Sequence, residues 1–260
     1  MFHKSIKLLI IIIHYYSLLN SQTHLISDPY NLLLIEKKQF DGKLVQQSNL
    51  FRPVFLPTDS INYSITLRAE NFFNNNNPNQ ENMDVRYFSK GSGLFYSLQL
   101  AINSPYFAFM FEPYHLNNNF FPSTNNITRG GPFSVLNDRT LSQKSFQEGF
   151  IRNFLVFLHY KGFGFGLHKG NRWWGPGKHT SFQMTNNTQP FMGQIFGTIN
   201  EIKIGKFGLY GLYTFVPLNR KSGYKAKYFT SLNGSITYYG SLHFTLGFSR
   251  NYLTGGVEIP

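Results

Sequence analysis

The sequence predicts an all-β protein, an antiparallel transmembrane outer-membrane β-barrel of which this chain supplies about ten to twelve strands. Three observations predict this fold class: alternating apolar and polar residues, strand lengths that suit a bilayer, and an N-terminal export signal. Aromatic residues make up 18% of the 260 residues and charged residues only 14%. That balance is typical of a barrel girdled by aromatic side chains, because its faces alternate between apolar and polar.

The first 21 residues predict a secretory signal peptide. Lys4 and Lys7 precede the apolar run LLIIII, and the small residue Ser21 ends the stretch, as in the charged, apolar and cleavage regions of such peptides. A membrane anchor is the alternative, but His14 interrupts the run well before the ~20 apolar residues that a spanning helix needs. We therefore expect residues 22–260 to form one exported barrel domain in the cell outer membrane.

Period-two alternation predicts the strands that follow. Residues 61–70 (INYSITLRAE) alternate without exception, and residues 94–103, 207–215 and 241–248 repeat the pattern. A soluble β-sandwich alternates as well, but strands of about nine to eleven residues match a tilted membrane-spanning strand, whereas sandwich strands are nearer five or six. In the first strand, we expect lipid contact from Ile61, Tyr63, Ile65 and Leu67, and a lumen-facing row of Ser64, Thr66 and Arg68.

The segments between these strands are long and rich in Asn. Residues 72–84 and 117–138 carry Asn, Pro and Gly clusters with little alternation, which predicts surface loops on the outside of the cell. Residues 28–55 have no clear period. They predict either a periplasmic plug or a first strand with its leader.

Residues 172–177, Arg-Trp-Trp-Gly-Pro-Gly, form the most informative stretch. Adjacent strand residues point to opposite faces, so Trp173 and Trp174 share one core only if the backbone turns between strands. Gly175, Pro176 and Gly177 supply such a turn. With the preceding FGFGLHKGN and the following SFQMTNNTQPF, this stretch resembles the signature of the capsule assembly protein Wzi family, over about residues 154–215.

The resemblance implies an outer-membrane barrel of about eighteen strands, lectin-like, that holds capsular polysaccharide at the cell surface. The chain departs from it in size, in Thr188-Gln189-Pro190, and in its final Gly-Gly-Val-Glu-Ile-Pro, which lacks the closing aromatic residue. We therefore expect a truncated or shortened member, with the barrel incomplete at the C-terminus. An open sheet edge is not tolerated in lipid.

Carbohydrate recognition gives the Trp motif a physical role, because sugar C–H faces stack on flat aromatic rings while sugar hydroxyls bond to Arg, Asn and Gln. The predicted polysaccharide-binding residues are Arg172, Trp173, Trp174, Asn186, Asn187 and Gln189. The alternative is architectural, since a Trp in an interfacial girdle beside a tight turn is a normal barrel feature.

Gly162, Gly164 and Gly166 alternate with larger apolar residues, which does not match the GxGxxG loop of a dinucleotide site. We expect all three on one face of a strand. They would leave either a smooth lumenal groove, against which a plug, a ring or a sugar lies, or a bend that lets the sheet curve.

Composition narrows the function classes. No cysteine is present, so no disulfide framework is expected. The net charge of +12 normally suggests nucleic acid, but the charges are scattered and the protein is exported. Contact with anionic lipid head groups or acidic glycans, or a solvated rim of charge, fits better.

Residues 149–200 contain no Asp or Glu to pair with His159, His168 or His179. We therefore expect no enzyme, cofactor or metal site. An outer-membrane lipase or acyltransferase that uses His159 or His168 is the minority alternative. The predicted function is a monomeric outer-membrane barrel that binds or anchors capsular or other surface polysaccharide. A general porin or uptake channel is the alternative, and it would need an open lumen.

Overall fold

The computed structural model describes residues 29–44, 47–48, 50–52, 55, 58–74, 84–86, 91–117, 135–136, 139–140, 150–177, 181, 183–184, 186, 190–218 and 227–255. The predicted signal peptide therefore lies outside the described residues. In the described residues, the helix α2 (Pro29–Phe40) precedes the strands. No helix in this part of the chain is long and apolar enough to cross a membrane.

The fold class is all-β and antiparallel, as predicted. The strands are β1 (Asn62–Asn74), β2 (Gly91–Asn103), β3 (Phe107–Asn117), β4 (Val135–Leu136), β5 (Arg139–Thr140), β6 (Ile151–Tyr160), β7 (Phe163–Lys169), β8 (Met192–Thr198), β9 (Ile202–Ile204), β10 (Phe207–Pro217), β11 (Tyr228–Tyr239) and β12 (His243–Thr254).

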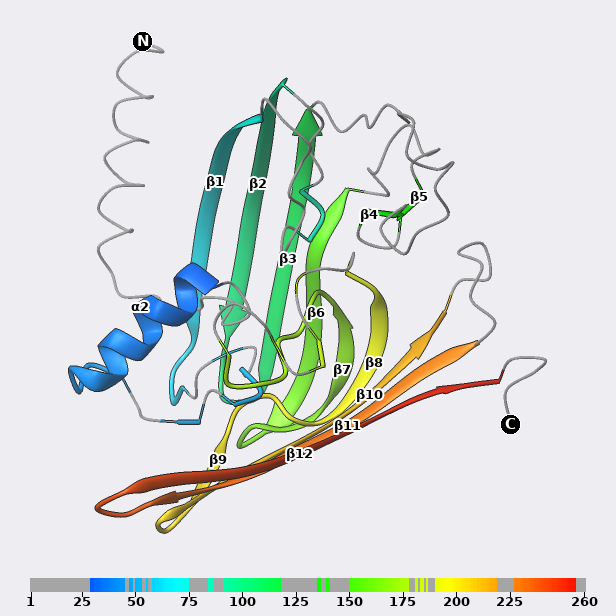
Figure 1. The fold of residues 1–260 in the computed structure, drawn as a ribbon. Helices are drawn as coiled ribbons and strands as arrows, with labels where there is room; N and C mark the ends of the chain where they lie inside the picture. The colour runs from blue at the N-terminus through cyan, green and yellow to red at the C-terminus, as the bar shows by residue number, and fades with distance from the viewer. Residues whose placement is uncertain are drawn as a thin grey trace, which may run out of the picture.

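All strands except β4 and β5 form one ten-stranded sheet in the order β1-β2-β3-β6-β7-β8-β10-β11-β12, with β9 paired to β10. Successive strands on this path are neighbours and pair antiparallel, so the sheet is a meander. Figure 1 shows that it curves strongly along this order. Among the described residues β1 and β12 are the two edges and do not pair with each other.

One face of the sheet, called the outer face below, carries exposed large apolar side chains. At the start of β1 the expected alternation is present, since Ile61, Tyr63, Ile65 and Leu67 are 57–77% exposed. Ser64, Thr66 and Arg68 lie on the opposite face and are half-buried. The remaining strands contribute to the outer face as well, with Tyr96, Leu98, Val156, Leu158, Phe165, Phe196, Tyr213, Leu232, Ile236, Phe244, Leu246 and Phe248.

The opposite, inner face is buried although much of it is polar. β2 turns Ser97, Gln99 and Asn103 inward, and β11 turns Ser231, Asn233, Ser235 and Thr237 inward. β3, β6, β8 and β10 add apolar side chains to the same face: Met110, Leu155, Phe157, Ile195 and Leu212. Alternation therefore separates an exposed apolar face from a mixed interior.

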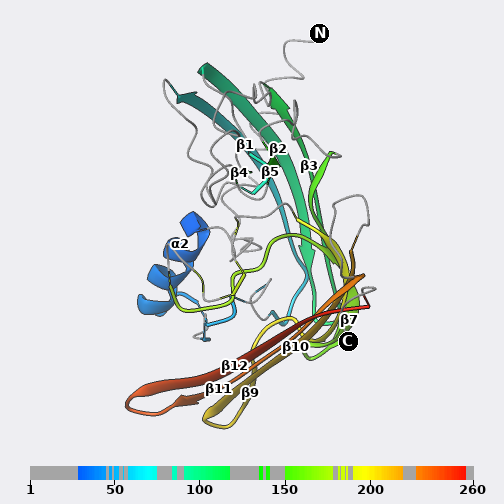
Figure 2. The ribbon, with the colours of Figure 1, turned by 45° about the vertical axis from the view of Figure 1, so that its right-hand side comes forward.

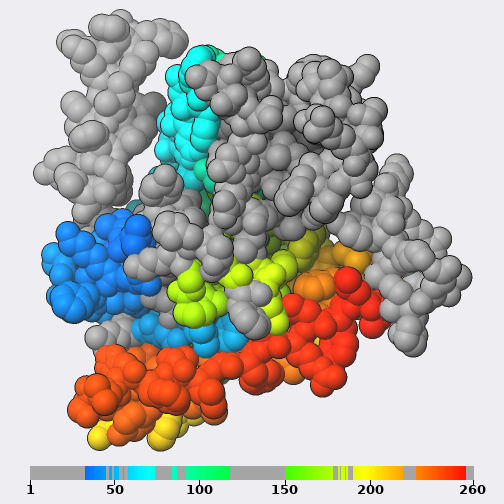
Figure 3. All heavy atoms as spheres, in the orientation of Figure 1, coloured from blue at the N-terminus to red at the C-terminus, as the bar shows by residue number. Residues whose placement is uncertain are grey.

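The N-terminal segment covers this inner face. Phe51 and Phe55 pack into the apolar cluster that the inner face presents, and Leu50 lies against the position of Gly247 on β12. Figure 2 shows α2 on the concave side of the sheet, and Figure 3 shows blue and yellow-green atoms lying between β1 and β12. Of the two alternatives for residues 28–55, the structure favours an interior plug over a first strand.

The predicted loop over residues 72–84 is wrong at both ends. β1 continues to Asn74, because Phe72, Phe73 and Asn74 still pair with the start of β2. Asp84 is buried on the inner side, where it neutralises an arginine. The second predicted loop was expected to begin at Asn117, but Asn117 is the last residue of β3. Residues 118–134 lie outside the described part.

The glycines after β6 serve sheet curvature. Gly162 is not on the strand as predicted but in the β6–β7 turn, where φ is 88° and the preceding Lys161 has φ 51°. A Cβ at Gly164 or Gly166 would lie 1.9 or 2.0 Å from a carbonyl oxygen of β6. Only glycine fits so close an approach. The bend, rather than an open lumenal groove, therefore accounts for Gly164 and Gly166.

Candidate functional site in the sheet interior

The Trp motif lies in the connection that follows β7 and folds inward. Trp173 and Trp174 are 0% and 1% exposed. Both adjacent rings are buried because the chain leaves the strand and turns at Gly175, whose φ is 150°. This is the backbone turn that the Gly-Pro-Gly sequence predicts.

Trp173 is held by the turn that follows it and by the N-terminal segment. Its indole Nε1 donates to the Gly177 carbonyl oxygen at 2.7 Å, and Arg52 Nη2 donates to the same oxygen at 2.7 Å. The Arg52 guanidinium lies 4.2 Å from the centre of the Trp173 ring, which is a cation–π contact. Burial lowers the pKa of Arg52 to about 10, while Glu36 opposes that shift.

Trp174 joins the same loop to the core. Its backbone N–H donates to the Met184 carbonyl at 3.2 Å, and its own carbonyl accepts from Ser181 Oγ at 2.6 Å. The Gly175 N–H donates to the Leu50 carbonyl at 2.9 Å. The Arg-Trp-Trp-Gly-Pro-Gly stretch therefore fastens residues 50–52 to the interior of the sheet.

The predicted polysaccharide-binding residues do not gather on a surface. Arg172, Trp173, Trp174 and Asn186 are all buried, and Asn187 and Gln189 lie outside the described residues. The Asn186 carbonyl accepts from the Asp84 N–H at 2.7 Å. Neither indole face is accessible to an external sugar in this conformation, so the structure favours the architectural role of the Trp pair.

A buried ion cluster, here called the Arg152 cluster, lies on the inner face near β1, β2, β3 and β6. Arg152 donates from Nε and Nη2 to Asp84 Oδ2, at 3.1 and 2.7 Å, and from Nη1 to Glu112 Oε1 at 2.8 Å. Arg86 adds two bonds to Glu70, at 3.1 and 2.9 Å. The described carboxylates and guanidinium groups of this cluster therefore neutralise one another.

Polar neighbours complete the Arg152 cluster. Ser97 Oγ donates to Glu112 Oε1 at 2.8 Å, and the Asn153 side-chain amide donates to Glu112 Oε2. The guanidinium groups of Arg86 and Arg152 lie 5.8 and 5.7 Å from the Phe95 ring centre.

The residues of the Arg152 cluster were not predicted from the sequence. The available signal was charge at inward positions of otherwise apolar strands, Glu112 in FAFMFEPY and Arg152 in IRNFLVF.

A second group of inward residues has no such neutralisation. Arg172 is 5% exposed, and neither its Nε nor its Nη2 has a hydrogen-bond partner. His168 Nε2 and Trp174 Nε1 are likewise buried without a partner. Arg172 lies within electrostatic range of His168 and of the buried Tyr210. Burial lowers the pKa of Arg172, and Tyr210 opposes that shift. Trp174 lies two residues after Arg172 and belongs to the same apolar cluster as Tyr210. Arg172, His168, Trp174 and Tyr210 are called the Arg172 cluster.

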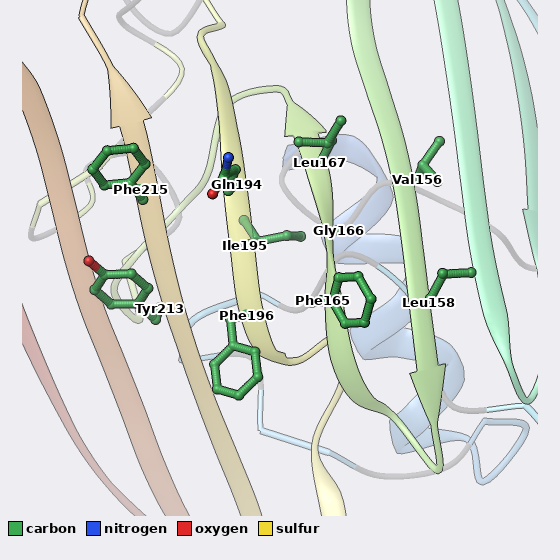
Figure 4. Close-up of a pocket in the computed structure, with 10 residues that line it drawn as sticks. All are labelled: Val156, Leu158, Phe165, Gly166, Leu167, Gln194, Ile195, Phe196, Tyr213 and Phe215. Carbon is green, nitrogen blue, oxygen red and sulfur yellow. The ribbon is translucent and has the colours of Figure 1, made fainter.

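The outer face carries one hollow, of about 470 Å³, over β6, β7, β8 and β10. Figure 4 shows its lining side chains along these neighbouring strands, and the polar one is Gln194. The others are Val156, Leu158, Phe165, Gly166, Leu167, Ile195, Phe196, Tyr213 and Phe215. Such a lining offers hydrocarbon contact rather than polar recognition.

The histidines of the minority enzyme hypothesis are separated. His159 contacts the β6–β7 turn, where its Nδ1 accepts from the Gly162 N–H at 3.3 Å, whereas His168 lies at the opposite end of β7. Among the described residues, no three His, Asp or Glu side chains are grouped to hold a metal ion. His179 lies outside the described residues.

Comparisons with protein-family models, with curated proteins and with solved structures find no match to this chain. Functional assignment therefore depends on the residues and geometry of the chain itself.

Proposed function

We propose that this chain is an outer-membrane protein of the β-barrel type that retains capsular or other surface polysaccharide and does not conduct solutes. The observation that carries the proposal is the separation of faces. Large apolar side chains are exposed on the outer face of the sheet, while the polar side chains of the same strands are buried inside. An apolar patch of this extent on a single face marks a contact with lipid or protein.

The two ends of the strands support a membrane orientation. In the meander, the turns β2–β3, β6–β7, β9–β10 and β11–β12 are short and lie at one end, and the long connections lie at the other. Outer-membrane barrels have short periplasmic turns and long external loops. The short-turn end also carries paired aromatic rings, with Tyr106 stacked on Tyr160 and Phe207 beside Tyr238, as an interfacial girdle requires.

The filled interior favours a polysaccharide holder over a channel. Leu50, Phe51, Phe55 and the Trp motif occupy the concave side, and the Arg152 cluster ties the β1–β2 connection to β6. A channel requires a continuous water-filled path, which this packing opposes. The resemblance of residues 172–177 to the Wzi family agrees with a holder. We place the polysaccharide contact on the long connections, with the Trp motif holding the interior beneath them.

The test uses the full chain in cells that make a capsule. The protein is expected in the outer-membrane fraction, with a heat-modifiable folded form, and its removal is expected to shift polysaccharide from the cells to the medium. Vesicles containing the protein are expected to swell no faster in sugar solutions than empty vesicles. Recovery as a soluble periplasmic protein would refute the barrel. Unchanged cell-bound polysaccharide would refute the holder, and rapid swelling would favour the channel.

A further inference from the structure

Arg172 is a buried cation on the inner face with unused donors. Within the part of the chain that the structure describes, its Nε and Nη2 atoms have no hydrogen-bond partner, and Trp174 Nε1 and His168 Nε2 are buried and unpartnered too. We infer that the Arg172 cluster is a binding site for a single anionic group, a carboxylate or phosphate. That the anionic group belongs to an acidic sugar residue rests on the proposed function. That the site binds an anion does not rest on it.

The first step of the argument is the missing counter-charge. Removing a guanidinium from water costs several kcal/mol unless a charge or several acceptors compensate it. The neighbours of Arg172 in sequence cannot supply a carboxylate, because residues 149–200 contain neither Asp nor Glu. Of the described groups, Tyr210 is the one that opposes the burial effect on the Arg172 pKa. A phenol is a weak substitute for a carboxylate at neutral pH.

The second step is the kind of atom that the cluster presents. The Arg172 guanidinium and the Trp174 indole are donors and have no acceptor, and the His168 imidazole donates from Nε2 in one tautomer or when charged. Arg172 has a planar fork that bonds a carboxylate or phosphate through two nitrogens. An anion is therefore the partner that satisfies these groups together, since a cation would meet repulsion from Arg172.

The third step is how the residues are held. His168 is an inward residue of β7, paired with Gly193 of β8, and Tyr210 is an inward residue of β10 packed with Trp174 in the apolar cluster. Arg172 and Trp174 lie in the connection fastened to residues 50–52. The donors thus come from two strands and one anchored connection, and such preorganisation lowers the cost of binding.

The test uses the folded full chain in detergent and the intrinsic fluorescence of tryptophan. The chain has two Trp residues, both in the motif, so the signal reports on this site. Sodium acetate, inorganic phosphate and sodium glucuronate are titrated, with glucose as the uncharged match to glucuronate. We expect a saturable change with at least one of the anions and none with glucose. Acetate or phosphate alone would identify a free anion, and preference for glucuronate would identify an acidic sugar.

Arg172→Gln is expected to weaken the anion response by roughly tenfold or more, because charged hydrogen bonds are lost. Arg250→Gln, on the exposed edge strand β12, is the matched control and should respond as the unchanged chain does. Arg172→Lys keeps the charge and should give an intermediate response if Arg172→Gln fails to fold. The site is refuted if no anion gives a saturable response, if glucose acts as well as glucuronate, or if Arg172→Gln responds normally. None of these outcomes depends on polysaccharide retention in cells.

Discussion

Arg152 and Arg172 occupy the same inner face and are equally buried, at 5% exposure each, yet their surroundings are opposite. Arg152 bonds to two carboxylates, whereas Arg172 Nε and Nη2 bond to nothing. A buried charge that is fully paired holds its neighbours in place, and one that is unpaired costs stability. The comparison separates a structural arginine from one whose donors remain available to a ligand.

The largest effect on stability should come from replacing Arg152, the arginine that is paired with carboxylates. Arg152→Gln leaves Glu112 buried without its cation and leaves Asp84 with the longer, 3.6 Å ion pair to Arg86. Removal of one partner from a buried pair costs about 3–5 kcal/mol. We expect loss of heat-modifiable folded protein and a lower urea midpoint. Arg250→Gln on the exposed edge serves as the control. A midpoint within error of the unchanged chain would show that the ion pairs contribute no net stability.

Trp173→Ala should have the next largest effect on stability, because it removes a fully buried ring together with its hydrogen bond to Gly177 and its contact with Arg52. Truncation of a buried Trp costs about 3–5 kcal/mol, and we expect the lower end because the long Arg52 side chain can move into the space. Folded protein and cell-bound polysaccharide should fall in proportion. Loss of polysaccharide with folded protein unchanged would instead restore the direct glycan role of the ring.

The comparison of faces can be tested on β1 alone. Ile65→Arg places a charge on the exposed apolar face, and in a membrane-embedded barrel this costs about 2–4 kcal/mol near mid-bilayer. Thr66→Arg places the same charge on the inner face, beside the existing Arg68. Folding into lipid vesicles should be impaired far more by the first change. Equal tolerance would contradict lipid contact for this face.

Arg172→Gln should cause no loss of stability, because it removes an uncompensated buried charge and no ion pair. It is therefore the counterpart of Arg152→Gln, with a similar change in sequence and a different environment. Urea unfolding of the two variants side by side measures the contrast. A loss for Arg172→Gln as large as that for Arg152→Gln would mean that Arg172 also has a structural partner.

Local pattern was enough to predict the strands and their two faces. The rows beginning at Ile61 and at Phe207 were recognisable because alternation has a period of two residues and needs no knowledge of the partner strand. The turn after Trp174 was recognisable for a similar reason, since Gly-Pro-Gly constrains backbone angles locally.

The interior was not predictable in the same way. Phe51 and Phe55 lie in a segment without period, and their place on the inner face depends on residues far away in the chain. Asp84 stands in an Asn-rich stretch that resembles an exposed loop, and its buried partners Arg152 and Asn186 are distant in the sequence. The sequence left the Trp pair open between sugar stacking and an architectural role, because its chemistry suits both. Burial, which decides accessibility, depends on the whole fold.

The bond from Arg52 to Gly177 also constrains the order of folding. It joins residues 125 positions apart, and the bond from Ser48 to Glu201 joins residues 153 positions apart. A chain synthesised from its N-terminus presents Phe51 and Phe55 long before their binding surface exists. Contacts between such distant positions form slowly, because the entropy of loop closure must first be overcome. The apolar side chains of Phe51 and Phe55 therefore stay exposed until the distant strands and the Trp motif have been made.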